Sequence, residues 1–351
     1  MTPNEGRRVR LRDVAERAGV SVGSASQAFG HPERVSEQLR ARVLAAAEAL
    51  GYAGPDPAAR RLRMGRTGVL GLLFAERLGY QFTDPAAPAF LRGVARGMRS
   101  APLGLLLLPD FRDRREAART VREAAVDGFI VYSAPRKDPR VDAALERRVP
   151  VVTVDQPRDL PTPFVGIDDR AAARAAAEHL RALGHARVAV LSFVRALDPE
   201  GTLVLDLTAE RLAGYRDGLG EAWNESMVRI CRPNAAGPAR RAALELLREP
   251  VPPTAILAMS DVLAIGALQA AAELGVSVPG ALSLVGFDDS PAAAVATPPL
   301  TTVAQPHEEK GRLATELLLE AIERANVSER PAHDILPTEL VVRESTSPVQ
   351  P

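Results

Sequence analysis

The N-terminal part of the chain has two runs of apolar positions at helical spacing, separated by a glycine. In the first run, apolar side chains recur at i, i+3, i+4 and i+7, at Leu11, Val14, Ala15 and Ala18. Gly19 can adopt the left-handed conformation that ends a helix, Val20 can fill the corner, and Ser21 can cap the next helix. This spacing predicts a helix-turn-helix.

The second predicted helix has an apolar face and an outward face. Its apolar face would pack on the first helix through Ala25, Ala28 and Phe29. Its outward face would present Ser21, Val22, Gly23, Ser24 and Gln27, where a recognition helix contacts base edges in the major groove of DNA. A third helix is predicted after Ser36, ending at Gly51–Tyr52, with a buried stripe at Leu39, Val43, Leu44, Ala47 and Leu50. The same pattern is compatible with a three-helix unit that has no DNA partner.

From Val69 onward, short apolar runs alternate with amphipathic stretches. We predict strands over residues 69–74, 103–109, 128–133, 149–155, 187–192, 254–260 and 282–288. We predict helices over residues 89–99, 113–126, 138–148, 168–183, 210–220, 237–248 and 262–274. This alternation predicts an α/β fold of doubly wound parallel sheets covered on both faces, and its length predicts two such sheets.

Polar residues just after predicted strands are candidates for ligand binding, because doubly wound sheets bind ligands beyond the carboxyl ends of their strands. Asp155 ends the fourth apolar run, Ser260–Asp261 the sixth and Asp288–Asp289 the seventh. Arg211 opens a helical segment, ERLAGY, from which its guanidinium could bind hydroxyl or carboxylate oxygens. Each candidate is also compatible with a helix cap or a surface ion pair, and we expect Asp261 to be a cap.

The segment between the third helix and the first strand, residues 53–68, has its own pattern. Pro55 and Pro57 stop the preceding helix, and residues 57–63 can form a short helix that is too short to be stable alone. Arg60, Arg61 and Arg63 surround the apolar Leu62, which suits a DNA minor groove where a leucine can wedge open a base step. Taken alone, these residues are also compatible with a flexible linker.

Charge is distributed unevenly along the chain. The 351 residues include 44 basic and 44 acidic side chains, so the formal net charge is zero. Residues 1–67 nevertheless hold twelve arginines against seven acidic residues, and the remainder is acidic. Arginines that face phosphates provide a salt-sensitive attraction that does not depend on base sequence. A basic segment that coincides with a helix-turn-helix favours DNA as the partner.

Composition narrows the other possibilities. The length predicts a small head and one or two larger domains. The single cysteine, Cys231, leaves no internal disulfide and fits a reducing compartment. No apolar run has signal-peptide character or bilayer-spanning length, so we expect a cytoplasmic protein without a membrane partner. The histidines lack metal-ligand spacing and no phosphate-binding loop or nucleophile elbow occurs, so we expect no metal, no cofactor and no catalytic residues.

Six motifs, in order along almost the whole chain, resemble the LacI/GalR (lactose/galactose repressor) family of bacterial transcription regulators. They are DVAERAGVS at 13–21, ARRLRMGRTGVLGL at 59–72, VGIDDRAAARAAAEHLRALGHARVAVL at 165–191, ERLAGY at 210–215, TAILAMSDVLAIGALQAAAELGVSVPGALSLVGFDD at 254–289 and TPPLTTVAQP at 297–306. The resemblance implies a helix-turn-helix head at 1–54, a hinge helix at 55–67 and a two-lobed core at 68–346 similar to a periplasmic sugar-binding protein.

The resemblance also implies a mechanism. Such proteins are homodimers whose paired heads bind a near-palindromic DNA operator. Their hinge helices fold together in the minor groove. A sugar-like effector in the interlobe cleft alters their affinity for DNA. By this likeness, Val22, Gly23 and Gln27 match base-contacting positions and Leu62 the intercalating leucine. Effector-contacting positions are matched by Arg211, Asp288 and Gln305, and more weakly by Ser260 and Asp155.

Several positions depart from the family pattern. Arg10 stands where a threonine usually caps the first helix, which could cost about 1 kcal/mol of helix stability. Gln27 replaces an arginine, so that adenine rather than guanine would suit its position, and Gly23 removes a base-contacting side chain. The first-lobe loop at 76–90 differs from the usual short segment. Its Tyr80, Phe82 and Asp84 could line the cleft, or could equally be loop packing.

The leading hypothesis is therefore a ligand-responsive, sequence-specific DNA-binding regulator that acts as a repressor and is not an enzyme. A solute-binding protein without a DNA role is a second hypothesis, which the absent signal sequence and the basic head oppose. An enzyme that uses the α/β cleft is a third, which no catalytic motif supports.

Overall fold

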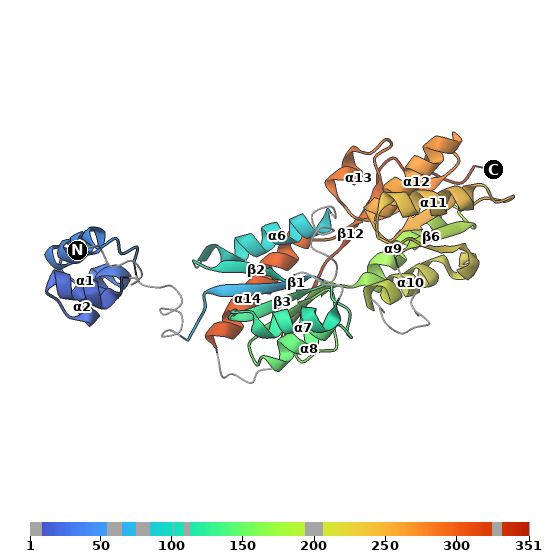
Figure 1. The fold of residues 1–351 in the computed structure, drawn as a ribbon. Coiled ribbons are helices and arrows are strands. Elements are labelled where there is room, and N and C mark those ends of the chain that lie inside the picture. Colours follow the sequence, from blue (N-terminus) through green and yellow to red (C-terminus); the bar gives the residue numbers. More distant parts are fainter. Residues whose placement is uncertain are drawn as a thin grey trace. The chain divides into compact units, whose positions relative to one another are not determined.

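The computed structural model describes residues 9–54, 65–74, 85–100, 102–108, 113–193, 206–324 and 332–350. The chain packs into two compact units, Met1–Gly68, called the head below, and Val69–Pro351, called the core (Figure 1).

The head is formed by α1 (Leu11–Ala18), α2 (Val22–Gly30) and α3 (Glu37–Ala49), with a 3₁₀ turn η1 (Pro32–Arg34) before α3. The predicted helix-turn-helix is confirmed. Gly19 ends α1 with a left-handed φ of 62°, and the side chain of Ser21 accepts a hydrogen bond from the Ser24 amide at 3.0 Å. Ser36 caps α3 in the same way through the Leu39 amide. These caps fix where α1 ends and where α2 and α3 begin.

The buried interior of the head is formed by the predicted apolar faces, with one exception. Val14, Ala15, Ala25, Ala28, Val43 and Ala47 are among its buried members. The prediction that Leu44 faces the interior of the head is wrong, because Leu44 is 40% exposed and Ala46 is buried instead. The buried face of α3 therefore includes Ala46 in place of Leu44.

The first lobe of the core contains a six-stranded parallel sheet with strand order β11-β5-β4-β3-β1-β2. Its strands are β1 (Val69–Phe74), β2 (Gly104–Leu108), β3 (Gly128–Tyr132), β4 (Val151–Val154), β5 (Phe164–Ile167) and β11 (His333–Leu336). One face is covered by α6 (Ala86–Gly97) and α14 (His307–Glu323), and the other by α7 (Arg114–Glu123) and α8 (Pro139–Glu146) (Figure 1). A 3₁₀ turn, η2 (Met98–Ser100), follows α6.

The second lobe contains another six-stranded sheet, with strand order β12-β10-β9-β8-β6-β7. Its parallel strands are β6 (Val188–Ser192), β7 (Val228–Ile230), β8 (Ala255–Ala258), β9 (Ser283–Asp288) and β10 (Thr301–Ala304), and β12 (Glu339–Val341) is antiparallel to β10. The helices are α9 (Asp169–Ala182) and α10 (Asp206–Leu219) on one side and α11 (Ala236–Leu247) and α12 (Asp261–Leu274) on the other, with α13 (Pro291–Val295) after β9 (Figure 1). Two 3₁₀ turns, η3 (Gly220–Ala222) and η4 (Glu225–Met227), precede β7.

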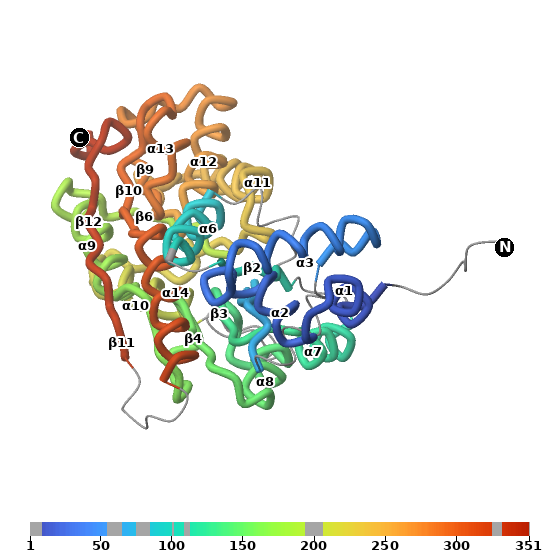
Figure 2. The backbone as a smooth tube through the Cα atoms, turned by 90° about the vertical axis from the view of Figure 1, so that its left-hand side faces the viewer, coloured from blue at the N-terminus to red at the C-terminus, as the bar shows by residue number. Residues whose placement is uncertain are grey.

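The chain passes between the two lobes after β5, after β10 and after β11. Figure 2 shows the last of these passages, where the C-terminal chain runs from β11 in the first sheet to β12 in the second. α14 therefore follows a strand of the second lobe but packs in the first, against α6. The two helices are very close there: a Cβ on Gly93 would lie 1.9 Å from the carbonyl oxygen of Glu308. This contact fixes the start of α14.

The predicted doubly wound α/β fold with two sheets is confirmed, but the list of elements was incomplete. The elements not predicted are β5, β7, β10, β11, β12, α13 and α14, and the second sheet is not purely parallel. Among the described helices, none is long and apolar enough to cross a lipid bilayer.

Candidate functional site

The outward face of α2 is a small, solvent-exposed surface. Val22 is 46% exposed although it is apolar, and Gly23 and Gln27 are exposed as well. The hydroxyl of Ser24 lies 2.9 Å from that of Ser21, so these two serines are held at the start of the helix. Candidate base-contacting groups thus lie on the side of α2 that faces away from the head's own core.

Asp13 provides the cap that Arg10 lacks. An arginine side chain cannot accept a hydrogen bond, and Arg10 precedes α1 in extended conformation. The Arg10 amide instead donates to Oδ2 of Asp13 at 2.8 Å. This contact is half of a capping box, and the carboxylate also lies favourably at the positive end of the helix. The departure at Arg10 therefore leaves α1 capped.

Five of the predicted site residues lie outside the described residues. They are Arg60 and Leu62 of the hinge segment and Tyr80, Phe82 and Asp84 of the first-lobe loop.

In the core, a buried lysine joins three of the predicted effector-contacting residues. Lys310 of α14 is fully buried and donates to Oδ1 of Asp155 at 2.5 Å and to Oε1 of Gln305 at 2.7 Å. The side-chain amide of Gln305 donates in turn, through Nε2, to Oδ1 of Asp288 at 2.5 Å. Asp155 lies directly after β4 of the first lobe and Asp288 ends β9 of the second. The row of polar contacts therefore runs from one lobe to the other.

Arg211 lies beside this row but is already engaged by protein groups. It does not open a helix as predicted, because α10 begins at Asp206 and Arg211 lies in the second turn. Its Nε donates to Oδ1 of Asp169 at 2.9 Å and its Nη1 to the Met259 carbonyl at 2.7 Å. The guanidinium also stacks over the ring of Phe287 at 3.7 Å. Of the two guanidinium nitrogens of Arg211 described above, only Nε therefore donates to a carboxylate.

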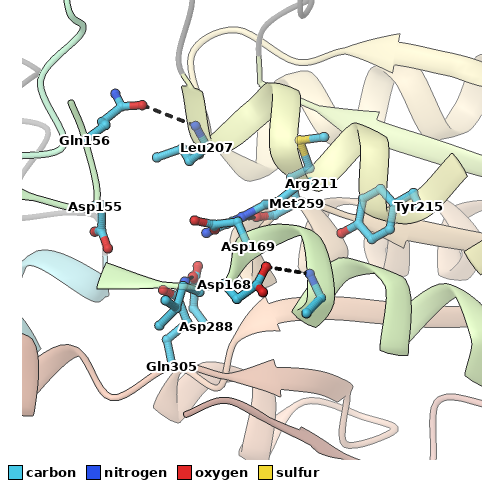
Figure 3. A network of polar contacts seen from close by, with 12 residues as sticks. Asp155, Gln156, Asp168, Asp169, Leu207, Arg211, Tyr215, Met259, Asp288 and Gln305 are labelled. Atoms are coloured by element: carbon cyan, nitrogen blue, oxygen red, sulfur yellow. Dashed lines mark hydrogen bonds and ion pairs between the residues drawn. The ribbon is translucent and has the colours of Figure 1, made fainter. Parts of the chain in front are cut away.

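Electrostatics keep this arginine charged. Burial alone would lower the pKa of Arg211, but the carboxylates of Asp169 and Asp288 outweigh it, so the pKa is raised. Figure 3 shows Arg211 and Asp169 on one side and Asp155, Asp288 and Gln305 on the other, all directed toward the same region. The structure thus brings four predicted residues together across the two lobes.

Ser260 and Asp261 make contacts other than those expected. Ser260, not Asp261, caps α12 by accepting from the Leu263 amide, and its hydroxyl donates to Asn234 at 2.7 Å. The prediction that Asp261 is a cap is wrong. Its carboxylate accepts from the hydroxyl of Thr302 and the amide of Ser290, both at 2.6 Å. Burial first, and the nearby Asp288 second, raise the pKa of Asp261 to about 7.

A pocket of about 640 Å³ opens beside Asp288 and Gln305. Its walls come from the start of α6, the segment after β9 and the start of α14. This volume is in the range of small-molecule sites. Among the described residues there is no group of three or more potential metal-binding side chains.

Sequence reasoning missed two groups in this region, Lys310 and Asp169. Asp169 holds Arg211 and also accepts from Nη2 of Arg158 at 3.0 Å. The DD pair at 168–169 looks like a helix start, and only its first member caps the helix, through the Ala171 amide. Nothing in the local pattern distinguishes the second member as the partner of an arginine 42 residues later.

Comparisons with known proteins agree with this architecture. Residues 10–54 match the family model "Bacterial regulatory proteins, lacI family", and residues 177–346 match "Periplasmic binding protein-like domain". The chain is 38% identical to the HTH-type transcriptional regulator Rv3575c of Mycobacterium tuberculosis, over 99% of each chain. It is 31% identical to the HTH-type transcriptional repressor CytR of Escherichia coli, over 96% of each.

Solved structures agree with the fold as well. A complex of the transcriptional regulator CelR with cellobiose is similar with a TM-score of 0.71 and 29% identity, over 96% of this chain and 100% of the other. The lac repressor dimer bound to operator and an anti-inducer has a TM-score of 0.79 and 24% identity, over 97% of this chain and 100% of the other.

Proposed function

The chain belongs to the lacI family of bacterial regulatory proteins, and we propose that it represses transcription as a homodimer that binds a near-palindromic operator. In this proposal a small, sugar-like molecule bound between the lobes of the core changes the affinity for DNA. The protein is a transcriptional regulator with a DNA-binding domain and a ligand-binding domain.

The exposed face of α2 supports the DNA-binding part of the proposal. Val22 and Gln27 extend from the second helix of a helix-turn-helix, the element that enters the major groove. A glutamine amide can donate to N7 and accept from N6 of adenine in a matched pair, so Gln27 would favour an A·T pair. Leu62 and Arg60 would act in the minor groove between the two half-sites.

The polar row across the lobes supports the effector part. Asp155, Gln305, Asp288 and Arg211 come from both lobes, so a ligand that contacts them would bias the angle between the lobes. Relatives support the kind of partner: the name of CytR describes a repressor, CelR was solved with cellobiose, and the lac repressor was solved as a dimer on its operator.

The first experiment is genome-wide immunoprecipitation of the protein with its bound DNA, followed by motif extraction. We expect a near-palindromic site with an A·T pair at the position facing Gln27 in each half. A protein that is abundant and folded in the cells, and yet enriches no DNA over background with or without added metabolite extract, would contradict the proposal. A site without internal symmetry would contradict the dimer.

A further inference from the structure

One buried carboxylate accepts hydrogen bonds from an arginine of each lobe. Asp169 is the first residue of α9 in the second lobe, and its side chain is 1% exposed. Its Oδ1 accepts from Nε of Arg211, on α10 of the same lobe, at 2.9 Å. Its Oδ2 accepts from Nη2 of Arg158, in the segment between β4 and β5 of the first lobe, at 3.0 Å. The two lobes therefore share this carboxylate.

Each arginine is also held by its own lobe. Nη2 of Arg158 donates to the carbonyl of Ile167 at the end of β5, and its guanidinium carbon lies 5.4 Å from the ring centroid of Phe164 on the same strand. Arg211 is held in the same manner by a backbone carbonyl and an aromatic ring of the second lobe. A guanidinium that stacks on a ring and donates to a carbonyl has little freedom to turn. Asp169 thus joins two preorganised cations, one from each lobe.

Two further hydrogen bonds cross between the lobes. The backbone amide of Leu207 on α10 donates to Oε1 of the fully buried Gln156, which follows β4, at 3.3 Å (Figure 3). Lys310, which is packed in the first lobe, donates to Gln305, which follows β10 of the second. A buried polar group that loses its partner is costly. Separation of the lobes would break bonds that the chain itself provides.

Only the contact between Arg158 and Asp169 joins opposite charges among these three crossings. Hydrogen bonds between two ionised groups are stronger than those between neutral groups. Arg211 remains charged beside the pair, since the carboxylates of Asp169 and Asp288 raise its pKa. If Arg158 loses its charge, Asp169 still has Arg211 in its own lobe but loses its cation from the first lobe. Arg158 is therefore the member of the group whose removal acts on the contact between lobes.

We propose that the ion pair of Arg158 and Asp169 holds the two lobes together without any ligand, and that the lobes open when the pair is removed. This closure is independent of the proposed function. One consequence rests on the proposed function: an effector that takes Arg211 away from Asp169 would also loosen Arg158, and would therefore open the lobes.

The test measures the distance between the lobes with two spin labels. The chain crosses between the lobes at the β11–β5 edge of the first sheet and the β12–β10 edge of the second, so β2 and β7 at the opposite edges separate most on opening. The helices that follow these two strands, α7 and α11, have exposed residues at Arg115 and Glu245. Arg115→Cys and Glu245→Cys are combined with Cys231→Ala, because Cys231 is the only native cysteine.

Double electron–electron resonance is recorded on the labelled full chain after exhaustive dialysis. We expect one narrow distance distribution in this parent protein. Arg158→Met, which removes the charge and the donors, should shift the distribution to longer distances and broaden it. Arg158→Lys keeps a cation that can donate to Asp169 and should restore most of the short distance. Asp169→Asn should resemble Arg158→Met, and the double variant should open no further than either single one, because both remove the same contact.

Two controls separate opening from unfolding. Arg174→Met removes an exposed arginine of α9 that pairs with Glu178 on the same helix, and should leave the distribution unchanged. Circular dichroism of Arg158→Met should show the helix content of the parent. If Arg158→Met does not fold, Arg158→Gln, which keeps a neutral donor, replaces it. A distribution in the folded Arg158 variant that matches the parent would overturn the inference, as would an equal shift in Arg174→Met or a parent that is already open.

Operator binding of the parent is measured separately and distinguishes this failure from failure of the proposed function. A protein that binds a specific DNA site, and whose lobes stay together without the Arg158 charge, refutes the inference alone. A protein whose lobes open as expected, but which binds no specific DNA, refutes the proposed function alone.

Discussion

The ammonium of Lys310 lies 2.5 Å from Oδ1 of Asp155, and neither side chain has appreciable contact with water. The lysine belongs to α14 and the aspartate directly follows β4, and the two are 155 residues apart in sequence. A buried charge pair is maintained only if each member satisfies the other, since either charge alone would be strongly destabilising in the interior.

Lys310→Met tests this pair. Methionine fills a similar volume without charge, so the buried Asp155 carboxylate loses its cation and the protein should be destabilised by about 3–5 kcal/mol. Urea unfolding of the parent and the variant measures the difference. Lys137→Met, at an exposed lysine, should change stability by less than about 0.5 kcal/mol.

The double variant Asp155→Asn, Lys310→Met should recover most of the loss, because the uncompensated charge is gone. If the double variant is as unstable as the sum of the two single variants, Lys310 and Asp155 do not stabilise each other.

Asp13→Ala tests the alternative cap of α1. The variant removes the acceptor for the Arg10 amide and should destabilise the head by about 1 kcal/mol. Because the head is a separate compact unit, we expect weaker DNA binding at elevated temperature without a change in the unfolding of the core. Circular dichroism of the head transition measures this, and Glu16→Ala, at an exposed position of the same helix, is the control.

The sequence was most informative where each buried position is apolar. Strands such as β3, which is buried along its whole length, appear as uninterrupted apolar runs and were predicted. α14 was missed because its buried face includes Lys310, Gly311 and Thr315. Lys310 becomes compatible with burial only through partners on other elements, and Thr315 by donating to the Gly311 carbonyl one turn earlier in the same helix. β7 and β12 have three residues each, too few for a recognisable period.

The site was predictable at strand ends and not beyond them. Asp155, Asp288 and Gln305 could be chosen because they follow strands or match family positions. Lys310, which binds Asp155 and Gln305, and Asp169, which binds Arg211, act through contacts between elements far apart in sequence, and no local pattern shows such a contact.

Stability should fall on acidification because of His185. This imidazole lies between Thr254 at 2.9 Å, Ser283 at 3.0 Å and the Ser347 carbonyl at 3.1 Å, and burial lowers its pKa. The unfolded chain, whose histidine keeps its ordinary pKa near 6.5, takes up the proton first as the pH decreases. The stabilising contribution is thus present above about pH 6.5 and is lost as the pH falls through the lower folded value.

Urea unfolding between pH 7.5 and pH 5 measures this dependence, with a slope from His185 of at most about 1.4 kcal/mol per pH unit. In His185→Gln this part of the slope should disappear, whereas His31→Gln, at an exposed histidine, should keep it. An unchanged slope in His185→Gln would show that another group is responsible.

Gln27→Arg should change which base pair the head prefers. Arginine pairs with O6 and N7 of guanine as glutamine pairs with adenine, so the preference at one position per half-site should move from A·T to G·C. We expect a change in discrimination of about 1–3 kcal/mol, measured by fluorescence anisotropy on single-site operator variants. Gln38→Arg adds the same charge to the exposed surface of α3 and should strengthen binding to all of these sites equally.

Leu62→Ala tests whether the hinge acts at a true operator. A leucine that wedges open a base step contributes only where the DNA is bent to receive it, so the variant should lose specific affinity far more than affinity for unrelated DNA. Arg60→Ala is the matched comparison, because loss of a phosphate contact should weaken binding to both DNAs and reduce the salt dependence. Titrations of both variants on the operator and on scrambled DNA at two salt concentrations separate the two effects. If Leu62→Ala lowers both affinities equally, the segment at 57–63 is a linker and not a hinge helix.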